Sequence, residues 1–348
     1  MKMQEIVLLL LEWYQFNKRI LPWRETKNPY YVWISEIMLQ QTRIETVIPY
    51  YERFIKKIPD ISSLAVISLD DLLKLWEGLG YYSRARNLKK AAQIIMEKYY
   101  GEFPSTYKEI IMLPGIGEYT ASAIASICFN ASTPTVDGNV LRVYTRVMND
   151  RRNIDLVKTK KEIREELSKI MPSDAGNFNE ALMELGEVIC LPNGMPKCDI
   201  CPIKKLCRAY IEKTWQQIPV RLEKKRKKEK FFTVFLFSYQ EYYAISKRKE
   251  QQLLQHLWEF FNIDGILTID EVKKYLEEKH IPFISIEKSI ENKHIFTHQI
   301  WYMQAYIVKV SSKMDHLVWK TLNEIDMKYA IPTAFQPFLE VLKKRDNA

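Results

Sequence analysis

Apolar residues recur every three or four positions through much of the first 215 residues, a spacing that places them on one face of a helix. The pattern is clearest in residues 30–51, 72–99, 119–129 and 160–171. Prolines, which interrupt helices, separate the helical stretches at Pro104, Pro114, Pro134, Pro172 and Pro192. The sequence therefore predicts an all-α domain over residues 1–215.

The pattern changes beyond residue 230. Residues 231–237 and 300–308 are rich in aromatic and β-branched residues, which favours strands, while residues 269–279 and 333–344 favour helices. We expect an α+β domain at residues 230–348. A linker is predicted at 216–229, because residues 221–230 carry seven positive charges that a core cannot bury. Such a run is usually solvated, although it could also follow a phosphate backbone.

Composition narrows the class of protein. The chain has 348 residues, 47% of them hydrophobic, and 52 Lys and Arg against 43 Asp and Glu give a net charge of +9. This charge favours nucleic acid as a partner, although it also fits an ordinary basic protein. The apolar run at residues 6–11 is too short to span a membrane and lacks the features of a signal peptide. We expect a buried helix there, and a cytoplasmic protein with no membrane partner.

A turn with two glycines, Gly115 and Gly117, lies between two helical stretches within residues 113–121. Backbone N–H groups at the start of a helix, together with the helix dipole, suit a phosphate oxygen. Gly-x-Gly before a helix is nevertheless more often an ordinary tight turn. The turn alone leaves both interpretations open.

Four of the five cysteines crowd into residues 190–207. Cys190, Cys198, Cys201 and Cys207 are separated by seven, two and five residues. Five cysteines without secretory context argue against a disulfide framework, so we interpret the four as metal ligands. Zinc and an iron–sulfur cluster both accept four cysteines. Structural zinc sites usually have two Cys-x-x-Cys pairs, and only Cys198 and Cys201 form one here, which favours iron–sulfur.

This cysteine spacing, the glycine turn and Val-Asp-Gly-Asn-Val at 136–140 together resemble the helix-hairpin-helix DNA glycosylases of the endonuclease III superfamily, which carry a four-iron four-sulfur cluster. Leu-Pro-Trp-Arg at 21–24, Trp-Ile-Ser-Glu-Ile-Met-Leu-Gln-Gln-Thr at 33–42 and Gly-Leu-Gly-Tyr-Tyr-Ser-Arg-Ala-Arg-Asn-Leu at 78–88 resemble its MutY-type adenine DNA glycosylases. The resemblance places a helix-hairpin-helix at about 108–129 and one cluster, ligated by the four cysteines, in a loop at 190–207. The family usually has six residues between the first two cysteines, so we expect the extra one to bulge at 192–194.

Breaking the bond between adenine and its sugar calls for two carboxyl groups in opposite protonation states. Glu36 lies in a helical stretch with apolar neighbours, and burial there would raise its pKa. Asp137 precedes a predicted helix, whose N-terminus favours the ionised form. A surface ion pair for Glu36 and a helix N-cap for Asp137 are the ordinary alternatives. The resemblance implies that Glu36 is the catalytic acid and that Asp137 stabilises the cationic intermediate.

The resemblance also implies residues that bind the substrate. Gln41 and Tyr81 match positions that wedge into the duplex when the base leaves it. Arg24 and Glu180 match residues that line the adenine pocket. Without the resemblance we would interpret Gln41 as a helix-surface amide, Tyr81 as a core residue, Arg24 as a surface charge and Glu180 as a helix-face ion pair.

Tyr119 marks a difference from relatives that cut the DNA strand. Bifunctional members such as endonuclease III carry a lysine just after the second glycine, and its amine attacks the sugar. Tyr119 occupies that place, and Leu141 lies where some MutY-type proteins have a lysine. We expect a monofunctional enzyme that uses water and leaves an abasic site.

Residues 253–260 and the triplet Phe296, Thr297 and His298 resemble parts of the Nudix-like domain that ends MutY-type proteins. In the family the triplet is usually Phe-Ser-His and recognises 8-oxoguanine in the opposite strand; packing of Phe296 and His298 in a strand is the alternative. A Nudix catalytic box needs two glycines, and only Gly265 follows Gly194. We expect this domain to recognise the lesion rather than to hydrolyse nucleotides.

The sequence therefore predicts a multidomain protein, an all-α helix-hairpin-helix glycosylase domain followed by an α+β Nudix-like domain. We expect it to act as a monomer on double-stranded DNA with adenine opposite 8-oxoguanine or guanine. An endonuclease III-like or mismatch-thymine glycosylase is the alternative within the superfamily. A DNA-binding iron–sulfur protein without catalysis is the alternative from another class.

Overall fold

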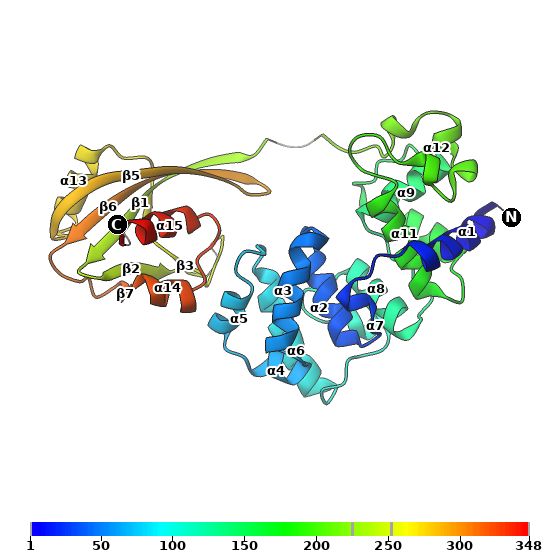
Figure 1. Cartoon of the computed structure of the whole chain (residues 1–348), viewed down its shortest axis with the longest axis horizontal. Coiled ribbons are helices and arrows are strands. Elements are labelled where there is room, and N and C mark those ends of the chain that lie inside the picture. Colours follow the sequence, from blue (N-terminus) through cyan, green and yellow to red (C-terminus); the bar gives the residue numbers. More distant parts are fainter. Residues whose placement is uncertain (1, 224–225, 251–252, 347–348) are drawn as a thin grey trace. The chain divides into compact units, whose positions relative to one another are not determined.

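The computed structural model describes residues 2–223, 226–250 and 253–346 (Figure 1). Its internal contacts divide the chain into two compact units. The first comprises Met1–Val66 with Asn87–Glu223, and the second comprises Ile67–Arg86 with Lys224–Ala348. The predicted boundaries near residues 215 and 230 stay predictions, and Lys224 and Lys225 of the predicted linker lie outside the described residues.

The first unit is helical. Its elements are α1 (Lys2–Asn17), η1 (Pro22–Arg24), α2 (Pro29–Leu39), α3 (Ile44–Lys57), α4 (Ile61–Val66), α7 (Tyr107–Ile110), α8 (Glu118–Phe129), α9 (Gly138–Met148), α10 (Val157–Ser168), α11 (Ala175–Val188), η2 (Cys198–Ile200), η3 (Lys204–Leu206), α12 (Arg208–Ile211) and η4 (Trp215–Gln217). Helix α6 (Ser83–Lys98) begins in the second unit and continues into the first.

Two of the predicted helical stretches are broken. Residues 30–51 form α2 and α3, and the chain reverses at Gln41, whose φ is +58°. Residues 72–99 form the end of α5 (Leu69–Leu75) and α6, separated by a loop in which Gly78, Gly80 and Tyr81 all have positive φ. A residue in the left-handed region ends a helix, and the apolar spacing continues across both breaks because the helices on either side of each break bury apolar side chains.

A core of apolar side chains joins α1, α9 and α11 in the first unit. Leu10, Val140 and Phe178 are almost fully buried within it. The apolar run at 6–11 lies in α1, where Ile6 and Val7 are buried while Leu8 is exposed. Among the described residues, no helix combines the length and the apolar character needed to cross a membrane.

The second unit holds a seven-stranded sheet with the order β3-β2-β1-β6-β5, in which β4 also pairs with β1 and β7 with β2. The strands are β1 (Lys228–Tyr239), β2 (Tyr242–Lys247), β3 (Trp258–Glu259), β4 (Phe261–Asp264), β5 (Phe283–Ile295), β6 (Gln299–Val310) and β7 (Val318–Lys320). Helices α13 (Ile269–Glu278), α14 (Leu322–Lys328) and α15 (Gln336–Asp346) accompany them (Figure 1). Only the β1–β6 pair is parallel among these strands.

Alternation along β1 explains why the sheet is covered on both faces. Val234 and Leu236 pack with α14 and α15, while Phe235 and Phe237 pack with α13. Strands β1 and β6 contain the two apolar runs that the sequence predicts as strands. Strand β5 was not predicted, because this edge strand is mostly exposed and rich in charged residues, so its sequence lacks a continuous apolar run.

Candidate active site

A cavity of about 550 Å³ lies in the helical unit and is lined by residues of η1, α2, the turn after α2, α8, α11 and the start of α9. Six of the residues singled out from the sequence line it: Arg24, Glu36, Gln41, Tyr119, Asp137 and Glu180. They come from segments up to about 150 positions apart, so the fold brings together side chains that the sequence separates.

Glu36 lies in α2, buried against the cavity wall with 6% of its surface exposed. Its Oε2 is buried and has no hydrogen-bond partner. Burial raises the pKa of Glu36 to about 7, and interaction with the Tyr119 hydroxyl opposes this rise. The helix-surface ion pair is therefore wrong for Glu36. A carboxyl group in this environment holds a proton near neutral pH.

Asp137 is the N-cap of α9. Its Oδ1 accepts a hydrogen bond of 2.7 Å from the Val140 backbone N–H, and its Oδ2 accepts one of 2.9 Å from the Asn139 side chain. Burial raises the pKa of Asp137, while these two hydrogen bonds and the charge of Arg142 oppose that rise. Two hydrogen-bond donors and a helix N-terminus stabilise the ionised form of Asp137, whereas Oε2 of Glu36 has no hydrogen-bond partner. The two carboxyl groups therefore differ in the way that acid and anion roles require.

Tyr119 is the second residue of α8, and its hydroxyl donates to Met183 Sδ at 3.3 Å. Burial and the neighbouring carboxyl groups of Glu36 and Asp137 raise its pKa well above 10. No lysine stands among the described residues that line the cavity. A primary amine for attack on a sugar is accordingly missing from the cavity lining as described.

Arg24 is mostly buried, not the surface charge that its residue type suggests. Its Nη2 donates to Glu184 at 2.8 Å and its Nε lies 3.4 Å from Glu180. Sequence reasoning missed Glu184 and its second partner, Arg19. One signal was present, because Glu180 and Glu184 are four residues apart and so share one face of a helix.

Gln41 is exposed in the turn between α2 and α3, at the edge of the cavity. It lies outside any helix, so it is not the helix-surface amide of the ordinary interpretation. Its left-handed backbone, with φ of +58°, turns the chain immediately after α2.

The glycine turn joins α7 to α8. Gly115 has a φ of +78°, and a Cβ added there would lie 2.6 Å from the Asn87 Cβ, so this position requires glycine. Gly117 is the N-cap of α8, with an ordinary φ of −94° and open space where a Cβ would be. A helix of 12 residues therefore begins beside open space without a capping side chain.

The four cysteines of residues 190–207 line one small cavity with mostly apolar walls. Arg146 Nη1 lies 3.3 Å from Cys190 Sγ and donates to the Leu191 carbonyl at 2.9 Å. Within the described residues, no set of three or more His, Cys, Asp or Glu side chains is positioned to hold a metal ion.

The seven residues between Cys190 and Cys198 leave the helical unit as an exposed loop. Residues 192–195 are exposed, and Gly194 has a φ of +72°. A hydrogen bond of 2.9 Å from the Lys197 N–H to the Ile189 carbonyl closes the base of this loop. The bulge expected at 192–194 stays a prediction, and these residues lie in the exposed part of the loop.

Tyr81, Phe296, Thr297 and His298 belong to the second unit. Tyr81 is 44% exposed, so it is not a core residue, and its hydroxyl lies 2.5 Å from Thr297 Oγ1. The triplet forms the turn between β5 and β6. Phe296 packs edge-on against Trp301 at 4.7 Å between ring centroids, whereas His298 is exposed. Packing is therefore the observed state of Phe296 but not of His298.

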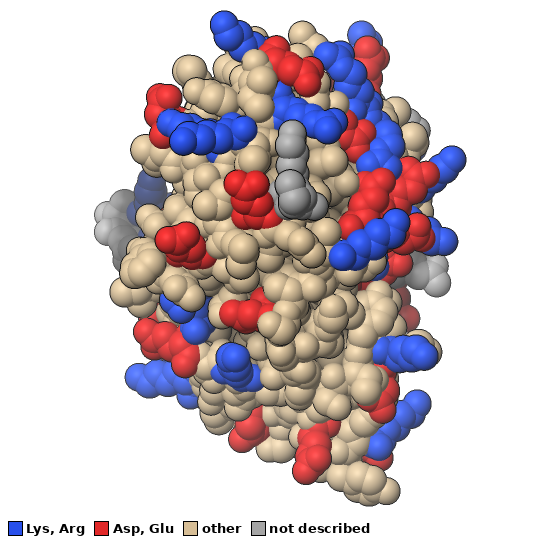
Figure 2. Space-filling model, turned by 90° about the vertical axis from the view of Figure 1, so that its right-hand side faces the viewer, with Lys and Arg blue, Asp and Glu red and all other residues tan. Residues whose placement is uncertain are grey.

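Charge is mixed on the face that Figure 2 shows. Lysine and arginine side chains alternate there with aspartate and glutamate, and uncharged areas separate them. The net charge of +9 is therefore not gathered into one basic patch on this face.

Two family models match the chain, one for each predicted domain. The model of the HhH-GPD superfamily base excision DNA repair proteins matches residues 34–173, and the model of the NUDIX domain matches residues 233–341. A helical glycosylase fold followed by a Nudix-like α+β fold is thereby confirmed.

Solved structures resemble the helical part of the chain. A thermostable thymine-DNA glycosylase is 30% identical with a TM-score of 0.56, and an endonuclease III in a non-covalent complex with DNA is 25% identical with a TM-score of 0.52. Each covers 61% of this chain and 97% of the other. These similarities alone do not separate the activities within the superfamily.

Sequence similarity over the whole length of the chain does separate these activities. The adenine DNA glycosylase of Buchnera aphidicola subsp. Acyrthosiphon pisum is 38% identical over 344 residues, which is 97% of each chain. Because the match covers 97% of this chain, it extends through both units. The chain accordingly belongs to the adenine DNA glycosylase family, and it is an enzyme of base excision repair that acts on N-glycosidic bonds.

Proposed function

We propose that the protein removes adenine opposite 8-oxoguanine or guanine in double-stranded DNA and leaves an abasic site. The observation that carries this proposal is the pairing of two unlike carboxyl groups in one cavity. Glu36 is buried with an unpartnered oxygen, and Asp137 accepts two hydrogen bonds at a helix N-terminus. An acid and an anion are what hydrolysis of a glycosidic bond through a cation-like transition state requires.

In the proposed reaction Glu36 donates its proton to the departing adenine. The bond to the sugar then breaks with its electron pair leaving on the base, and the sugar gains positive charge. Ionised Asp137 stabilises that charge. Water then adds to the sugar carbon and gives its proton to the Glu36 carboxylate, which restores the acid. Tyr119 contacts the Glu36 side of the cavity and adjusts the pKa of the acid.

We infer a monofunctional enzyme from the same cavity. Tyr119 stands where a strand-cutting relative would carry lysine, and the cavity lining described above contains no amine. Borohydride treatment during turnover should therefore trap no covalent adduct between enzyme and DNA. Efficient trapping would overturn this part of the proposal.

The remaining cavity residues suit recognition of the base. Arg24 and Glu180, paired across 3.4 Å, present a donor and an acceptor to a purine that enters the cavity. Gln41, exposed at its edge, is proposed to fill the space that the extruded base leaves in the duplex, and Tyr81 to stack there.

We propose that the β5–β6 turn recognises the opposite base. Thr297 and His298 are exposed at the turn. The Thr297 hydroxyl shares a hydrogen bond with the Tyr81 hydroxyl, and the exposed His298 imidazole can form hydrogen bonds with a base. Phe296 anchors the turn through its contact with Trp301. A domain without a Nudix catalytic box suits lesion recognition rather than nucleotide hydrolysis.

DNA is the partner that these assignments require, and the glycine turn is its proposed backbone anchor. Gly115 shapes the turn, and Gly117 leaves open space at the start of α8 where a phosphate oxygen can approach backbone N–H groups. The endonuclease III that resembles this unit was solved with DNA. We propose a monomer that works on chromosomal DNA, in the cytoplasm of a bacterial-type cell.

One four-iron four-sulfur cluster is the proposed cofactor. The donor set fits, because the four cysteines that would supply sulfur ligands line one small cavity with mostly apolar walls. When bound, the cluster would supply iron–thiolate bonds that hold the loop of residues 190–207. Cys190, Cys198, Cys201 and Cys207 would be its ligands.

The test is the single-turnover rate constant of adenine excision opposite 8-oxoguanine, measured from pH 5.5 to 9. For the intact enzyme the rate should fall as pH rises through about 7, because Glu36 must be protonated to act and its pKa is raised to about 7. Glu36→Gln should lower the rate by about 10²- to 10⁴-fold. An unchanged rate in that variant would remove Glu36 from the reaction and with it the proposed mechanism.

A further inference from the structure

Glu184 is a fully buried carboxylate at the edge of the cavity, with no exposed side-chain surface. It accepts hydrogen bonds from the Arg19 backbone N–H at 3.2 Å, Arg19 Nε at 2.6 Å, Arg19 Nη2 at 2.9 Å and Arg24 Nη2 at 2.8 Å. These bonds join α11 to the segment around η1, some 160 residues earlier in the chain. One carboxylate therefore fixes two arginines.

Burial of a charge is costly unless partners satisfy it. Burial raises the pKa of Glu184, but the hydrogen bonds and charges of Arg19 and Arg24 outweigh it and leave that pKa below its ordinary value. Glu184 is therefore ionised, and its negative charge is directed at the two arginines. Burying this ionised carboxylate costs more free energy than burying a neutral side chain at the same place. We therefore expect the negative charge of Glu184 to serve a function.

Arg24 connects Glu184 to the rest of the cavity. Its Nε lies 3.4 Å from Glu180, and its guanidinium lies 5.7 Å from the centre of the Tyr14 ring. The positive charge of Arg24 also acts on Glu36, whose pKa it lowers. A fixed Arg24 can thus bind substrate, but an unbalanced Arg24 would draw the proton off the catalytic acid.

Several charged or titratable groups face Glu36 from the elements around it. Glu180 of α11 and Asp137 at the start of α9 raise its pKa, while Tyr119 of α8 and Arg24 of η1 lower it. Arg24 is the member of this set that Glu184 contacts directly. A change of charge at position 184 should therefore alter the pKa of Glu36 mainly through Arg24.

We infer that Glu184 is a positioning residue for adenine excision. It holds Arg19 and Arg24 in the cavity wall and balances the charge of Arg24, so that Glu36 keeps its proton near neutral pH. This inference rests on the proposed role of Glu36 as the general acid.

The test is Glu184→Gln, which keeps the size of the side chain and one oxygen acceptor but removes the charge. Under single-turnover conditions with saturating enzyme, the fall of the excision rate with rising pH should occur at a midpoint at least roughly half a pH unit lower than in the wild type. Because one pH unit corresponds to tenfold in protonation, the rate at pH 7.5 should fall by about three- to tenfold. At pH 5.5, where Glu36 is protonated in both proteins, the rates should approach each other.

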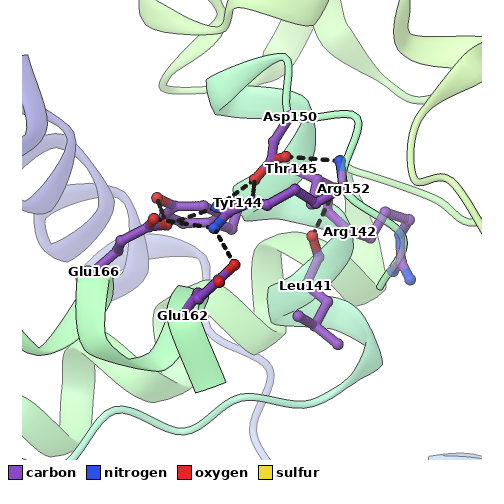
Figure 3. Close-up of polar contacts among 8 residues, drawn as sticks. All are labelled: Leu141, Arg142, Tyr144, Thr145, Asp150, Arg152, Glu162 and Glu166. Carbon is purple, nitrogen blue, oxygen red and sulfur yellow. Dashed lines mark hydrogen bonds and ion pairs between the residues drawn. The ribbon is translucent and has the colours of Figure 1, made fainter. Parts of the chain in front are cut away.

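A matched control is available in a second arginine–carboxylate network of the same unit. Glu166 Oε2 accepts hydrogen bonds from Arg152 Nη2 at 2.8 Å and from the Tyr144 hydroxyl at 2.5 Å, as Figure 3 shows. It does not line the cavity. Glu166→Gln also removes a negative charge that faces an arginine. The midpoint of its pH–rate profile should equal that of the wild type.

The outcomes separate the possibilities. An unshifted midpoint in Glu184→Gln, with a rate that is unchanged or lowered equally at every pH, would overturn the inference. Should Glu184→Gln fail to fold, Arg24→Gln tests the same coupling with the opposite sign, and its midpoint should move to higher pH; no upward shift would overturn the inference. A wild-type profile without a fall near pH 7, or an active Glu36→Gln, would instead overturn the proposed role of Glu36.

Discussion

Glu36 and Asp137 show how local environment, rather than residue type, assigns chemical roles. Both are carboxyl groups on the wall of one cavity. Asp137 gains two hydrogen bonds from the first turn of its helix, whereas one oxygen of Glu36 is buried without a partner. Because an unsolvated carboxylate is costly, burial raises the pKa of Glu36 to about 7, whereas at Asp137 the hydrogen bonds oppose the rise that burial causes in its pKa.

A buried carboxyl group held in this way should lower the stability of the fold above neutral pH. The folded-state pKa of Glu36, about 7, lies above its ordinary value of 4.5, so its contribution to stability is full below pH 4.5 and is lost as pH rises through about 7. The difference corresponds to on the order of 3 kcal/mol. Glu36→Gln, which cannot ionise, should therefore lose less unfolding free energy than the wild type between pH 5 and pH 8.

Urea unfolding of both proteins at the two pH values measures this difference. The Glu166→Gln variant, which carries its change at a partly exposed carboxylate away from the cavity, is the control. An equal pH dependence in the wild type and Glu36→Gln would show that burial of Glu36 does not strain the fold.

Some residues of the site could be predicted from sequence and others could not. Glu36, Asp137 and Tyr119 stand in motifs whose local pattern indicates a helix or a helix start. Glu184 stands outside these motifs, and its spacing from Glu180 indicates only a shared helix face. Its partner Arg19 is 165 positions away, and only the folded chain brings the two together. Patterns in a single sequence carry information about residues that are close together along the chain. They do not predict which distant charged residues pair in the interior.

At the scale of elements, the helix breaks decide where several of these residues lie. The apolar spacing predicted one helical stretch over residues 30–51, yet Gln41 adopts a left-handed conformation and ends α2. A glycine or proline would have signalled this break, and glutamine does not. The break removes Gln41 from a helix face and leaves it exposed at the cavity edge.

Two substitutions in the turn between α7 and α8 test separately the shape of the turn and its contact with DNA. Gly115→Ala would place a Cβ 2.6 Å from the Asn87 Cβ on a backbone with φ of +78°, so it should lower stability by about 1–3 kcal/mol. Gly117→Ala meets no atom within 4 Å and should keep the melting temperature of the wild type within about 2 °C.

Duplex binding at fixed salt, followed by fluorescence anisotropy, completes this comparison. If a phosphate approaches the start of α8, the added methyl group of Gly117→Ala should weaken binding several-fold while the fold is intact. Affinity equal to the wild type in Gly117→Ala would remove this turn from the DNA interface. Wild-type stability in Gly115→Ala would contradict the described turn.

For the molecule as a whole, we propose that the two units carry different parts of the activity. The helical unit resembles a thymine-DNA glycosylase and an endonuclease III, so its fold alone does not fix the base that is removed. Similarity to an adenine DNA glycosylase extends through both units. The proposed division is therefore that the cavity excises the base and the β5–β6 turn selects the base opposite.

The fold class of each unit was predictable from sequence, since helical spacing and two aromatic strands carry a strong local signal. The sheet was only partly predictable. Strand β5 has exposed positions along much of its length, several of them charged. It pairs with β6, and no pattern in its own sequence predicts this pairing. Its turn with β6 presents Thr297 and His298, so the lesion-reading proposal depends on a strand that the pattern missed.

Single-turnover excision by the full chain from matched duplexes tests the central claim most directly. The duplexes carry adenine opposite 8-oxoguanine, adenine opposite guanine, and thymine opposite guanine. We predict base release from the first duplex, at a rate equal to or above that from the second, and none from the third. Release of thymine alone would contradict the assignment of adenine as the base removed.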